Sequence, residues 1–457
     1  MKFRVDHDIL ADAVGWVARA LPTRPVVPVL SGLRLDADAG GLALSCFDYE
    51  LSATVGIAAQ VEEPGTALVP GRLLAEIVRS LPGEPAEFTT DGDAVLLTCG
   101  SAEFELVALP LAEYPALPAP PPLAGTIDGG ELAAALTQVL PAASRDDTLP
   151  MLTGVRFDID GDTMTLAATD RYRLAVRDVQ WSPARPGLRA AALVPARTLA
   201  DAARSMAPGV PVSVAFTAAG ADGPAERGQA QTRSASAGSA HSGPVPSGPA
   251  HSGPAPSGPA QAAPPPAEGM ISFATAGRRL ATRLIAGEFI RYQSRFPASF
   301  GCWAEVPAAS FIEAVRRVSL VADRASPVRL SFGHGTVAVE AATEGRARAA
   351  ETVTANFHGD QPVIAFNPHY LLDGLVAAAA ANPSPDPAAA GEQAGAETAK
   401  TRSVPSPATI RMDFTSPAKP ALITRAAAGG GQPDSSGAGG RPAFRYLVVP
   451  LRPAASG

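Results

Sequence analysis

The residues that could carry out catalysis do not gather into a catalytic pattern. Asp146 and Asp147 are adjacent carboxylates, but neighbours at such a boundary point apart, and Asp there usually caps a helix or forms a turn. Asp48 and Asp170 occupy equivalent places in two repeats described below, which indicates a shared turn. No histidines have metal-ligand spacing, no glycine-rich phosphate loop follows a strand, and no Ser or Cys has a nucleophile's setting. We therefore expect no enzymatic activity, no metal and no cofactor.

Arginines recur at a spacing that suits contact with phosphate. The pairs are seven residues apart, two turns along one helix face: Arg72 and Arg79, Arg197 and Arg204, and Arg317 and Arg324. Guanidinium groups in such a stripe can offset phosphate charge without reading a base sequence. A solvated helix face is the alternative interpretation of each stripe. No aromatic residues are interleaved with the arginines, so base stacking is not indicated.

Charge and cysteine usage narrow the class of protein. The formal net charge of −7 argues against a surface that attracts nucleic acid everywhere, but it allows one basic face. The three cysteines are far apart, which indicates neither a disulfide framework nor a metal-binding pair. No uncharged apolar stretch approaches the roughly 20 residues that span a bilayer, and the chain start alternates like a strand. We expect a cytoplasmic protein without membrane contact.

The chain repeats itself three times. Gly32–Asp36 is echoed by Gly154–Asp158, and Val328–Phe332 stands for the same strand further on. A helix start is repeated in the same way in Val69–Leu74, Val194–Leu199 and Phe366–Leu371, with a proline in or next to the first turn of each. Within each unit the expected order is helix, strands, helix, strands. This order predicts an α+β fold in which each repeat has two helices on one face of antiparallel sheets.

Three insertions rich in Pro, Gly, Ser and Ala interrupt these repeats. They cover residues of about 219–269, 382–405 and 426–441. Such sequences bury too little apolar surface to offset the entropy of ordering, so we expect them to be disordered. The domains are expected at 1–122, 123–299 and 300–457.

Five motifs then occur in a recognisable order. They are Arg24–Leu30, Asp146–Gly154, Ala168–Ala175, Ser416–Leu422 and Tyr446–Arg452. With them the chain resembles the bacterial sliding clamp, the beta subunit of DNA polymerase III, in an actinobacterial style. The resemblance covers nearly the whole chain outside the insertions. It implies a head-to-tail homodimer whose six domains close a ring around duplex DNA, so that one chain forms half of the ring. The replicative polymerase, tethered to that ring, would gain processivity in DNA replication.

A ring that confines DNA by topology needs only weak contacts to the duplex, which is consistent with the acidic net charge. The resemblance implies that Arg24, Arg145 and Asp146 touch DNA. We extend this expectation to the repeated arginines, namely Arg72, Arg79, Arg197 and Arg204.

The resemblance also implies a groove in which the polymerase and the clamp loader insert short linear peptides. Its expected residues are Leu152, Thr169, Tyr172, Arg173, Leu174, Pro420, Leu447, Val448, Val449, Pro450, Leu451 and Arg452. The apolar majority suits burial of a partner Leu or Phe, worth roughly 1.5–3 kcal/mol per side chain. Ordinary core positions are the alternative interpretation of these residues.

Several positions depart from the family pattern near this groove. Phe289–Tyr292 reads Phe-Ile-Arg-Tyr where Phe-Pro-Asp-Tyr is usual, and Arg295 replaces an aliphatic residue. Arg171 stands where some members have Gly, and the chain continues past Arg452. A clamp-like paralogue that acts as a protein scaffold without encircling DNA therefore remains an alternative.

For the interface between the two subunits, the resemblance implies apolar contacts at Phe104, Leu320 and Val321. The predicted strand 102–107 could also pair its edge across the subunits.

Overall fold

The structure is a computed structural model that describes residues 1–217, 269–323, 326–343, 345–360, 362–380, 408–426 and 442–451. The three insertions expected from the sequence lie almost wholly outside the described residues. Arg324 and Arg452 lie outside them too.

Within the described residues, each repeat consists of nine strands and two α-helices in the same order. The first repeat contains β1 (Lys2–Val5), α1 (His7–Ala18), β2 (Gly32–Asp38), β3 (Gly41–Phe47), β4 (Leu51–Ile57), β5 (Gln60–Glu63), β6 (Gly65–Pro70), α2 (Gly71–Ser80), β7 (Ala86–Asp91), β8 (Ala94–Cys99) and β9 (Ala102–Val107). The second contains β10 (Leu123–Asp128), α3 (Gly129–Val139), β11 (Gly154–Asp160), β12 (Thr163–Thr169), β13 (Arg173–Gln180), β14 (Ser182–Pro183), β15 (Arg189–Pro195), α4 (Ala196–Ala203), β16 (Pro211–Phe216), β17 (Met270–Thr275) and β18 (Arg278–Arg283). The third contains β19 (Cys302–Pro307), α5 (Ala308–Ser319), β20 (Val328–Phe332), β21 (Thr336–Thr343), β22 (Ala347–Thr354), β23 (Asn356–His358), β24 (Val363–Phe366), α6 (Pro368–Ala379), β25 (Thr409–Phe414), β26 (Ala421–Arg425) and β27 (Phe444–Val448). The threefold repeat and the α+β order expected from the sequence are confirmed.

The helices begin where the sequence places capping residues or prolines. Asp6 caps α1 by accepting hydrogen bonds from the backbone N–H groups of residues 8 and 9, and Asp128 and Asn367 do the same for α3 and α6. Pro70 and Pro195 stand directly before α2 and α4. The predicted helix starts are therefore confirmed.

The described strands form four sheets, and two of these continue from one repeat into the next. One nine-stranded sheet joins the first and second repeats through the antiparallel pair β4 and β18. The other joins the second and third repeats through β13 and β27. A five-stranded sheet, β5-β1-β7-β8-β9, remains in the first repeat, and a four-stranded sheet, β22-β21-β20-β24, remains in the third.

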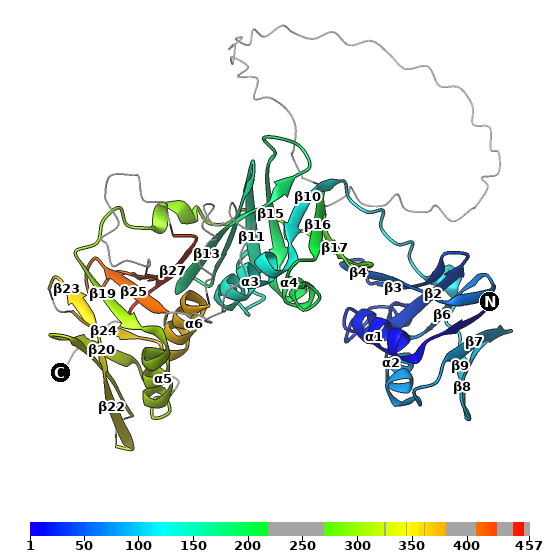
Figure 1. The fold of residues 1–457 in the computed structure, drawn as a ribbon, viewed down its shortest axis with the longest axis horizontal. Coiled ribbons are helices and arrows are strands. Elements are labelled where there is room, and N and C mark those ends of the chain that lie inside the picture. Colours follow the sequence, from blue (N-terminus) through cyan, green and yellow to red (C-terminus); the bar gives the residue numbers. More distant parts are fainter. Residues whose placement is uncertain are drawn as a thin grey trace, which may run out of the picture. The chain divides into compact units, whose positions relative to one another are not determined.

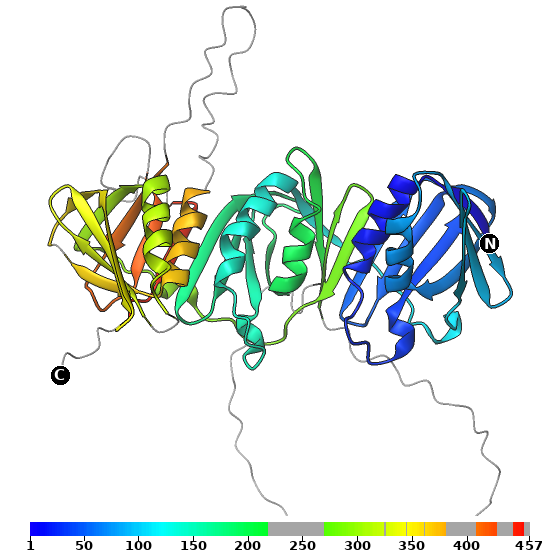
Figure 2. The same cartoon turned by 90° about the horizontal axis from the view of Figure 1, so that it is seen from below.

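The two helices of each repeat lie side by side, α1 with α2, α3 with α4 and α5 with α6 (Figures 1 and 2). Their apolar residues face the sheets; in α1 these are Leu10, Val14 and Val17, all of which are buried. Ile9 in the first turn of α1 is 43% exposed, whereas Leu10 next to it is buried.

One close contact in the third repeat is possible only because a helix residue lacks a side chain. Gly374 of α6 faces the ring of Tyr446 on β27, and a Cβ built at Gly374 would stand 2.4 Å from the nearest ring carbon. Tyr446 is fully buried, its hydroxyl donates to the backbone oxygen of Tyr370 at 2.8 Å, and burial raises its pKa above the ordinary value. Helix α6 therefore packs directly against the Tyr446 ring at Gly374.

Gly374→Ala is expected to lower the free energy of unfolding by about 1–3 kcal/mol, since overlap with the ring outweighs the better helix propensity of Ala. Gly15→Ala in α1 is the matched control. Its Cβ would meet nothing within 4 Å, so this variant should gain up to about 1 kcal/mol. Thermal or urea unfolding of both variants measures the difference. A Gly374→Ala protein that unfolds no earlier than the unmodified protein would contradict the packing described here.

Candidate peptide groove and DNA-contacting residues

A tight turn between β12 and β13 presents the side chains expected at the peptide groove. The Asp170 carboxylate accepts hydrogen bonds from the backbone N–H groups of Tyr172 and Arg173 at 3.0 and 3.1 Å. Arg171 has a left-handed backbone conformation, with φ of 81°. In the first repeat Asp48 accepts from the N–H groups of residues 50 and 51, and Tyr49 has φ of 74°. The shared turn predicted for Asp48 and Asp170 is confirmed.

Arg173 connects this turn to the third repeat. Its guanidinium donates to Asp170 Oδ2 at 3.0 Å and to Asp373 of α6. It also lies over the Tyr370 ring, 4.5 Å from the ring centre. The Arg173 side chain is only 11% exposed, so it acts mainly as an internal bridge between the two repeats and leaves little of its charge for a partner.

Two tyrosines stack beside this bridge. The rings of Tyr172 and Tyr370 lie 5.9 Å apart, centre to centre, and are nearly parallel. Tyr172 is 50% exposed, and the Arg171 guanidinium lies 5.9 Å from the centre of its ring. The pair offers an apolar surface with a cation at its edge.

Strand pairing brings the C-terminal groove residues next to this turn. Leu174 lies opposite Leu447, Arg173 lies opposite Val448, and the Val449 N–H donates to the Tyr172 oxygen at 2.8 Å. The Leu451 N–H donates to Ala365 at the edge of β24. Residues 169–174 and 447–451 therefore form one continuous patch.

The members of this patch differ in exposure. Thr169, Leu174, Leu447, Val448 and Pro450 are buried, whereas Tyr172, Val449 and Leu451 are exposed. Leu152 is buried in a short turn, residues 150–152, and Pro420 directly precedes β26. The buried members support the patch, and the exposed members are those that a peptide could touch.

Sequence reasoning missed Tyr370 and Asp373. Both lie on α6, just after the helix start that the sequence does show, and Asp373 is 200 residues from Arg173. The sequence places both residues shortly after a helix start, but it does not show which residues of the other repeat they meet.

The residues expected to touch DNA are exposed, with different local partners. Arg24, Arg145 and Asp146 lie in exposed segments. Asp146 accepts hydrogen bonds from the hydroxyl and the N–H of Thr148, which lower the pKa of its carboxyl.

Neighbouring carboxylates or backbone oxygens offset part of the positive charge of the repeated arginines. Arg72 donates to the backbone oxygens of residues 21 and 22, Arg197 lies 3.8 Å from Asp147, and Arg204 pairs with Asp201 at 2.9 Å. Arg79 is exposed in the last turn of α2. All four side chains stand on α2 or α4 or directly after them.

The expected subunit contacts lie on exposed or half-exposed positions. Phe104 is half-buried on β9, the outermost strand of the five-stranded sheet. Leu320, the residue that ends α5, is 83% exposed, and Val321 after it is half-buried.

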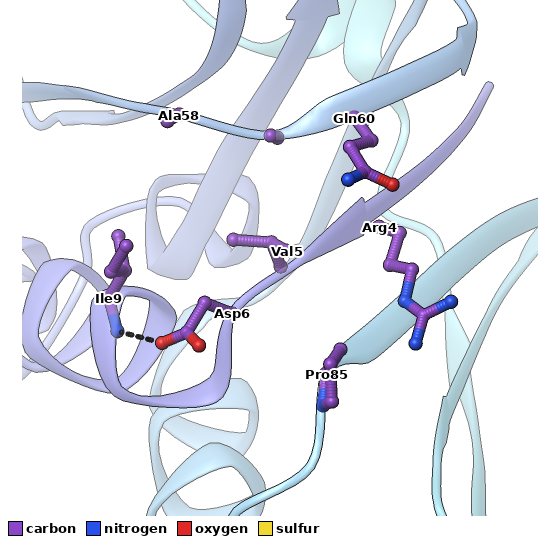
Figure 3. A pocket seen from close by; sticks show the side chains of 8 residues that line it. Arg4, Val5, Asp6, Ile9, Ala58, Gln60 and Pro85 are labelled. Carbon is purple, nitrogen blue, oxygen red and sulfur yellow. Dashed lines mark hydrogen bonds between the residues drawn. The ribbon is translucent and has the colours of Figure 1, made fainter.

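A crevice of about 350 Å³ opens beside the start of α1 (Figure 3). It is lined by Arg4, Val5, Asp6, Ile9, Ala58, Ala59, Gln60 and Pro85. A crevice of about 380 Å³ recurs in the second repeat, where Thr126, Ile127 and Asp128 replace Arg4, Val5 and Asp6. The crevice therefore follows from the fold of the repeat, since its position is kept while its side chains change.

Among the described residues, no three His, Cys, Asp or Glu side chains are grouped so as to hold a metal ion. No helix in this part of the chain is long and apolar enough to cross a membrane.

Comparison with known proteins identifies the family. Three family models match in succession: the N-terminal domain of the DNA polymerase III beta subunit over residues 1–118, its central domain over 126–234 and its C-terminal domain over 293–382. The beta sliding clamp of Streptomyces coelicolor is 42% identical over 99% of both chains. That of Micrococcus luteus is 42% identical over 77% of this chain and 98% of its own.

Solved structures agree in fold. The DNA polymerase sliding clamp of Bacillus subtilis matches with a TM-score of 0.75 at 21% identity, over 99% of this chain and all of that one. A Pseudomonas aeruginosa sliding clamp bound to griselimycin matches with a TM-score of 0.74 at 20% identity, over 99% of both chains. From the three domain matches in order and the full-length identity to curated clamps, this chain belongs to the bacterial DNA polymerase III beta subunit family, the sliding clamps.

Proposed function

We propose that this protein is a DNA sliding clamp: a head-to-tail homodimer that closes around duplex DNA in the cytoplasm and tethers the replicative polymerase, without chemistry of its own. The observation that carries this proposal is how the strands of each repeat are divided between sheets. Each junction between repeats pairs five strands of one repeat with four of its neighbour. Among the described strands, five remain unjoined in the first repeat and four in the third.

The two remaining sheets have the edges that such a junction requires. At the junctions, the last strand of one repeat (β18 or β27) pairs with the third strand of a meander in the preceding repeat (β4 or β13). The corresponding strands at the free edges are β9 and β22 (Figure 1). An unpaired edge favours addition of another strand. A second copy, placed head to tail, would pair β9 with β22 twice and so close a ring of six repeats.

Exposed apolar side chains near these edges support the same assembly. Val107 at the end of β9 is 69% exposed, and Leu320 is more exposed still. Single exposed apolar residues are ordinary on protein surfaces. Here, however, they accompany the free strand edges, so their burial between subunits would add to the strand pairing.

The proposed contact with DNA is weak and independent of base sequence. Arg24, Arg145 and the arginines of α2 and α4 supply positive charge, and part of that charge is offset by neighbouring carboxylates. Because a closed ring cannot leave circular DNA, contacts to phosphate need only lower the repulsion between the acidic protein and the duplex.

Tethering is proposed at the patch of residues 169–174 and 447–451. A short peptide from the polymerase or the clamp loader would place an apolar side chain against Tyr172 and the exposed residues beside it. Tethering then keeps the polymerase at a high effective concentration at the primer end.

Circular DNA separates the clamp from a scaffold paralogue that does not encircle DNA. Loaded onto nicked circular DNA by a clamp loader and ATP, the protein is expected to co-elute with the DNA in gel filtration at high salt and to be released when a restriction enzyme linearises the circle. Retention by topology is insensitive to salt, whereas electrostatic binding is not. Release from intact circles at high salt, or retention on linear DNA, would refute the encircling function.

Arg24→Ala combined with Arg145→Ala should weaken binding to linear duplex DNA at low salt and reduce the salt dependence of that binding by a slope of roughly two, about one for each phosphate that an arginine no longer neutralises. Retention on circles after loading should not change. Arg189→Ala is the control, because Arg189, on the edge strand β15, is exposed but pairs with Asp160 of β11. Titration of a fluorescent duplex at several salt concentrations measures the slope, and an unchanged slope in the double variant would contradict these contacts.

Tyr172→Ala is expected to weaken binding of a fluorescent peptide that contains Leu and Phe roughly 10- to 100-fold, because an exposed aromatic anchor is removed. Tyr49→Ala is the matched control: Tyr49 lies in the equivalent turn of the first repeat and is similarly exposed. Fluorescence anisotropy measures both affinities. Equal losses of affinity in the two variants would show that the second-repeat turn is not the binding site.

A further inference from the structure

Resting on the head-to-tail dimer proposed above, we propose the residue register and the charge polarity of its subunit seam. Phe104 of β9 lies opposite the partner's Ala349 on β22, and Glu105 lies opposite the partner's Arg348. Beside the strands, Arg317 of α5 donates to the end of the partner's α2 at Ser80. The seam is therefore acidic on the β9 side and basic on the β22 side.

The two junctions within the chain fix the register on the β22 side. The first meander of each repeat consists of three antiparallel strands: β2-β3-β4, β11-β12-β13 and β20-β21-β22. In each of these meanders one row of paired residues starts at an equivalent arginine. The rows are Arg34, Ser45 and Thr54; Arg156, Ala167 and Val176; and Arg329, Glu340 and Ala350. The residues that precede the last members of these rows are Ala53, Ala175 and Ala349. Ala53 lies opposite Leu280 at the first junction, and Ala175 lies opposite Tyr446 at the second.

The register on the β9 side follows from the second meander of each repeat, which is β7-β8-β9, β16-β17-β18 or β25-β26-β27. Leu280 is paired on its inner side with Phe273, and Tyr446 with Ile423. These partners in turn pair with Val214 and Met412. In the first repeat the corresponding row is Phe88, Leu97 and Phe104. Phe104 therefore occupies the place of Leu280 and Tyr446, which sets it opposite Ala349.

Burial agrees with this register. Leu280, Tyr446, Ala53 and Ala175 are all buried at the junctions within the chain. Phe104 and Ala349, their counterparts at the free edges, are half-buried and pack against the core with one side only. Pairing of β9 with β22 would give both residues the cover that their counterparts already have.

Backbone hydrogen bonds add the geometry of the pairs. Arg283 N–H donates to Glu50 and Val449 N–H donates to Tyr172. In an antiparallel ladder hydrogen-bonded and non-hydrogen-bonded pairs alternate, so Leu280 with Ala53 and Tyr446 with Ala175 are non-hydrogen-bonded pairs. The pair Phe104 and Ala349 inherits that geometry, in which opposed Cα atoms are about 4.5 Å apart. This separation is suitable for a disulfide.

The same register sets opposite charges face to face. Glu105 and Glu103 point to the face of β9 that is opposite to Phe104, and both are exposed. In the proposed register Glu105 faces the partner's Arg348 across the seam. The Arg348 side chain is 74% exposed and lies 3.1 Å from Glu340 on its own sheet. Opposite charges on paired strands stabilise a sheet, whereas like charges there destabilise it. The seam thus favours a second copy of this chain over a different clamp whose residue opposite Glu105 or Arg348 carries the same charge.

The helices carry a parallel argument. At the first junction the tenth residue of α1, Trp16, donates to Ser205, the tenth position counted from the start of α4, at 2.6 Å. At the second junction the tenth residue of α3, Gln138, donates to the tenth residue of α6, Ala377, at 3.0 Å.

The tenth residues of the two helices left at the free edges are Arg317 in α5 and Ser80 in α2. Arg317 is already oriented by two hydrogen bonds to Glu351 of β22, and its side chain remains 55% exposed. A guanidinium has five donors, and the C-terminal end of a helix, which is where Ser80 lies in α2, attracts a cation. Arg317 can therefore bind Ser80 or the last carbonyls of the partner's α2 while it keeps Glu351.

Cysteine cross-linking tests the register in the full chain. Phe104→Cys with Ala349→Cys should give covalent dimers under mild oxidation, since the native cysteines are buried. Phe104→Cys with Ala347→Cys, and Phe104→Cys with Glu351→Cys, shift the register by two residues and should give several-fold less. Preferred cross-linking of a shifted pair would overturn the register while leaving the dimer intact. If light scattering instead shows the unmodified chain to be monomeric at working concentration, the proposed dimer itself fails.

Charge exchange tests the polarity. Glu105→Arg should raise the dimer dissociation constant roughly tenfold, since like charges then meet at both seams. Arg348→Glu should do the same, and the two changes together should restore it. Failure of the double exchange to restore dimerisation would overturn the pairing.

Arg317→Ala should weaken the dimer several-fold, whereas Arg316→Ala, which removes an exposed neighbour paired with Glu313 on its own helix, should not. Equal effects of the two variants would refute the contact with α2. Circular dichroism melts of each variant establish that the fold is kept.

Discussion

Backbone hydrogen bonding between edge strands is the interaction on which the rest of this structure depends. Strands β18 and β27 each end one repeat's sheet and continue another's, so no repeat is a closed module. An edge strand in water presents a row of unsatisfied donors and acceptors. The chain meets this demand at two junctions, where β4 pairs with β18 and β13 with β27, and the proposed dimer would do the same for β9 and β22. With that pairing each repeat would have a neighbour on both sides, and the six repeats of the dimer would close a ring.

This constraint explains how an acidic protein can act on an acidic polymer. Affinity for phosphate is not what holds a closed ring on DNA, so the arginines of α2 and α4 need not be free of carboxylate neighbours. The pairs between Arg197 and Asp147 and between Arg204 and Asp201 reduce the positive charge that these arginines can offer to phosphate, and salt screens what remains. The proposed DNA-facing surface would thus suit movement along the duplex and would not favour a fixed position.

The sequence was sufficient for the repeat, the helix starts and the turns at Asp48 and Asp170, because each of these rests on local chemistry: a cap, a proline, an amide-to-carboxylate bond. It was insufficient where residues far apart in the chain meet. Asp373 and Tyr370 complete the surroundings of Arg173 from another repeat, and the hydrogen bond from Trp16 to Ser205 spans 189 positions. Side-chain exposure was likewise out of reach of the sequence pattern: in the first turn of α1, Ile9 is 43% exposed and Leu10 is buried.

The bridge made by Arg173 has an effect on how the groove responds to mechanical load. One guanidinium holds the turn of the second repeat and a helix of the third, so bending between those two repeats would strain the proposed peptide patch. Conversely, a protein pulling on Tyr172 would load α6 through the stack of Tyr172 on Tyr370. The proposed docking surface would thus be stiffened by the same ion pairs that link the two neighbouring repeats.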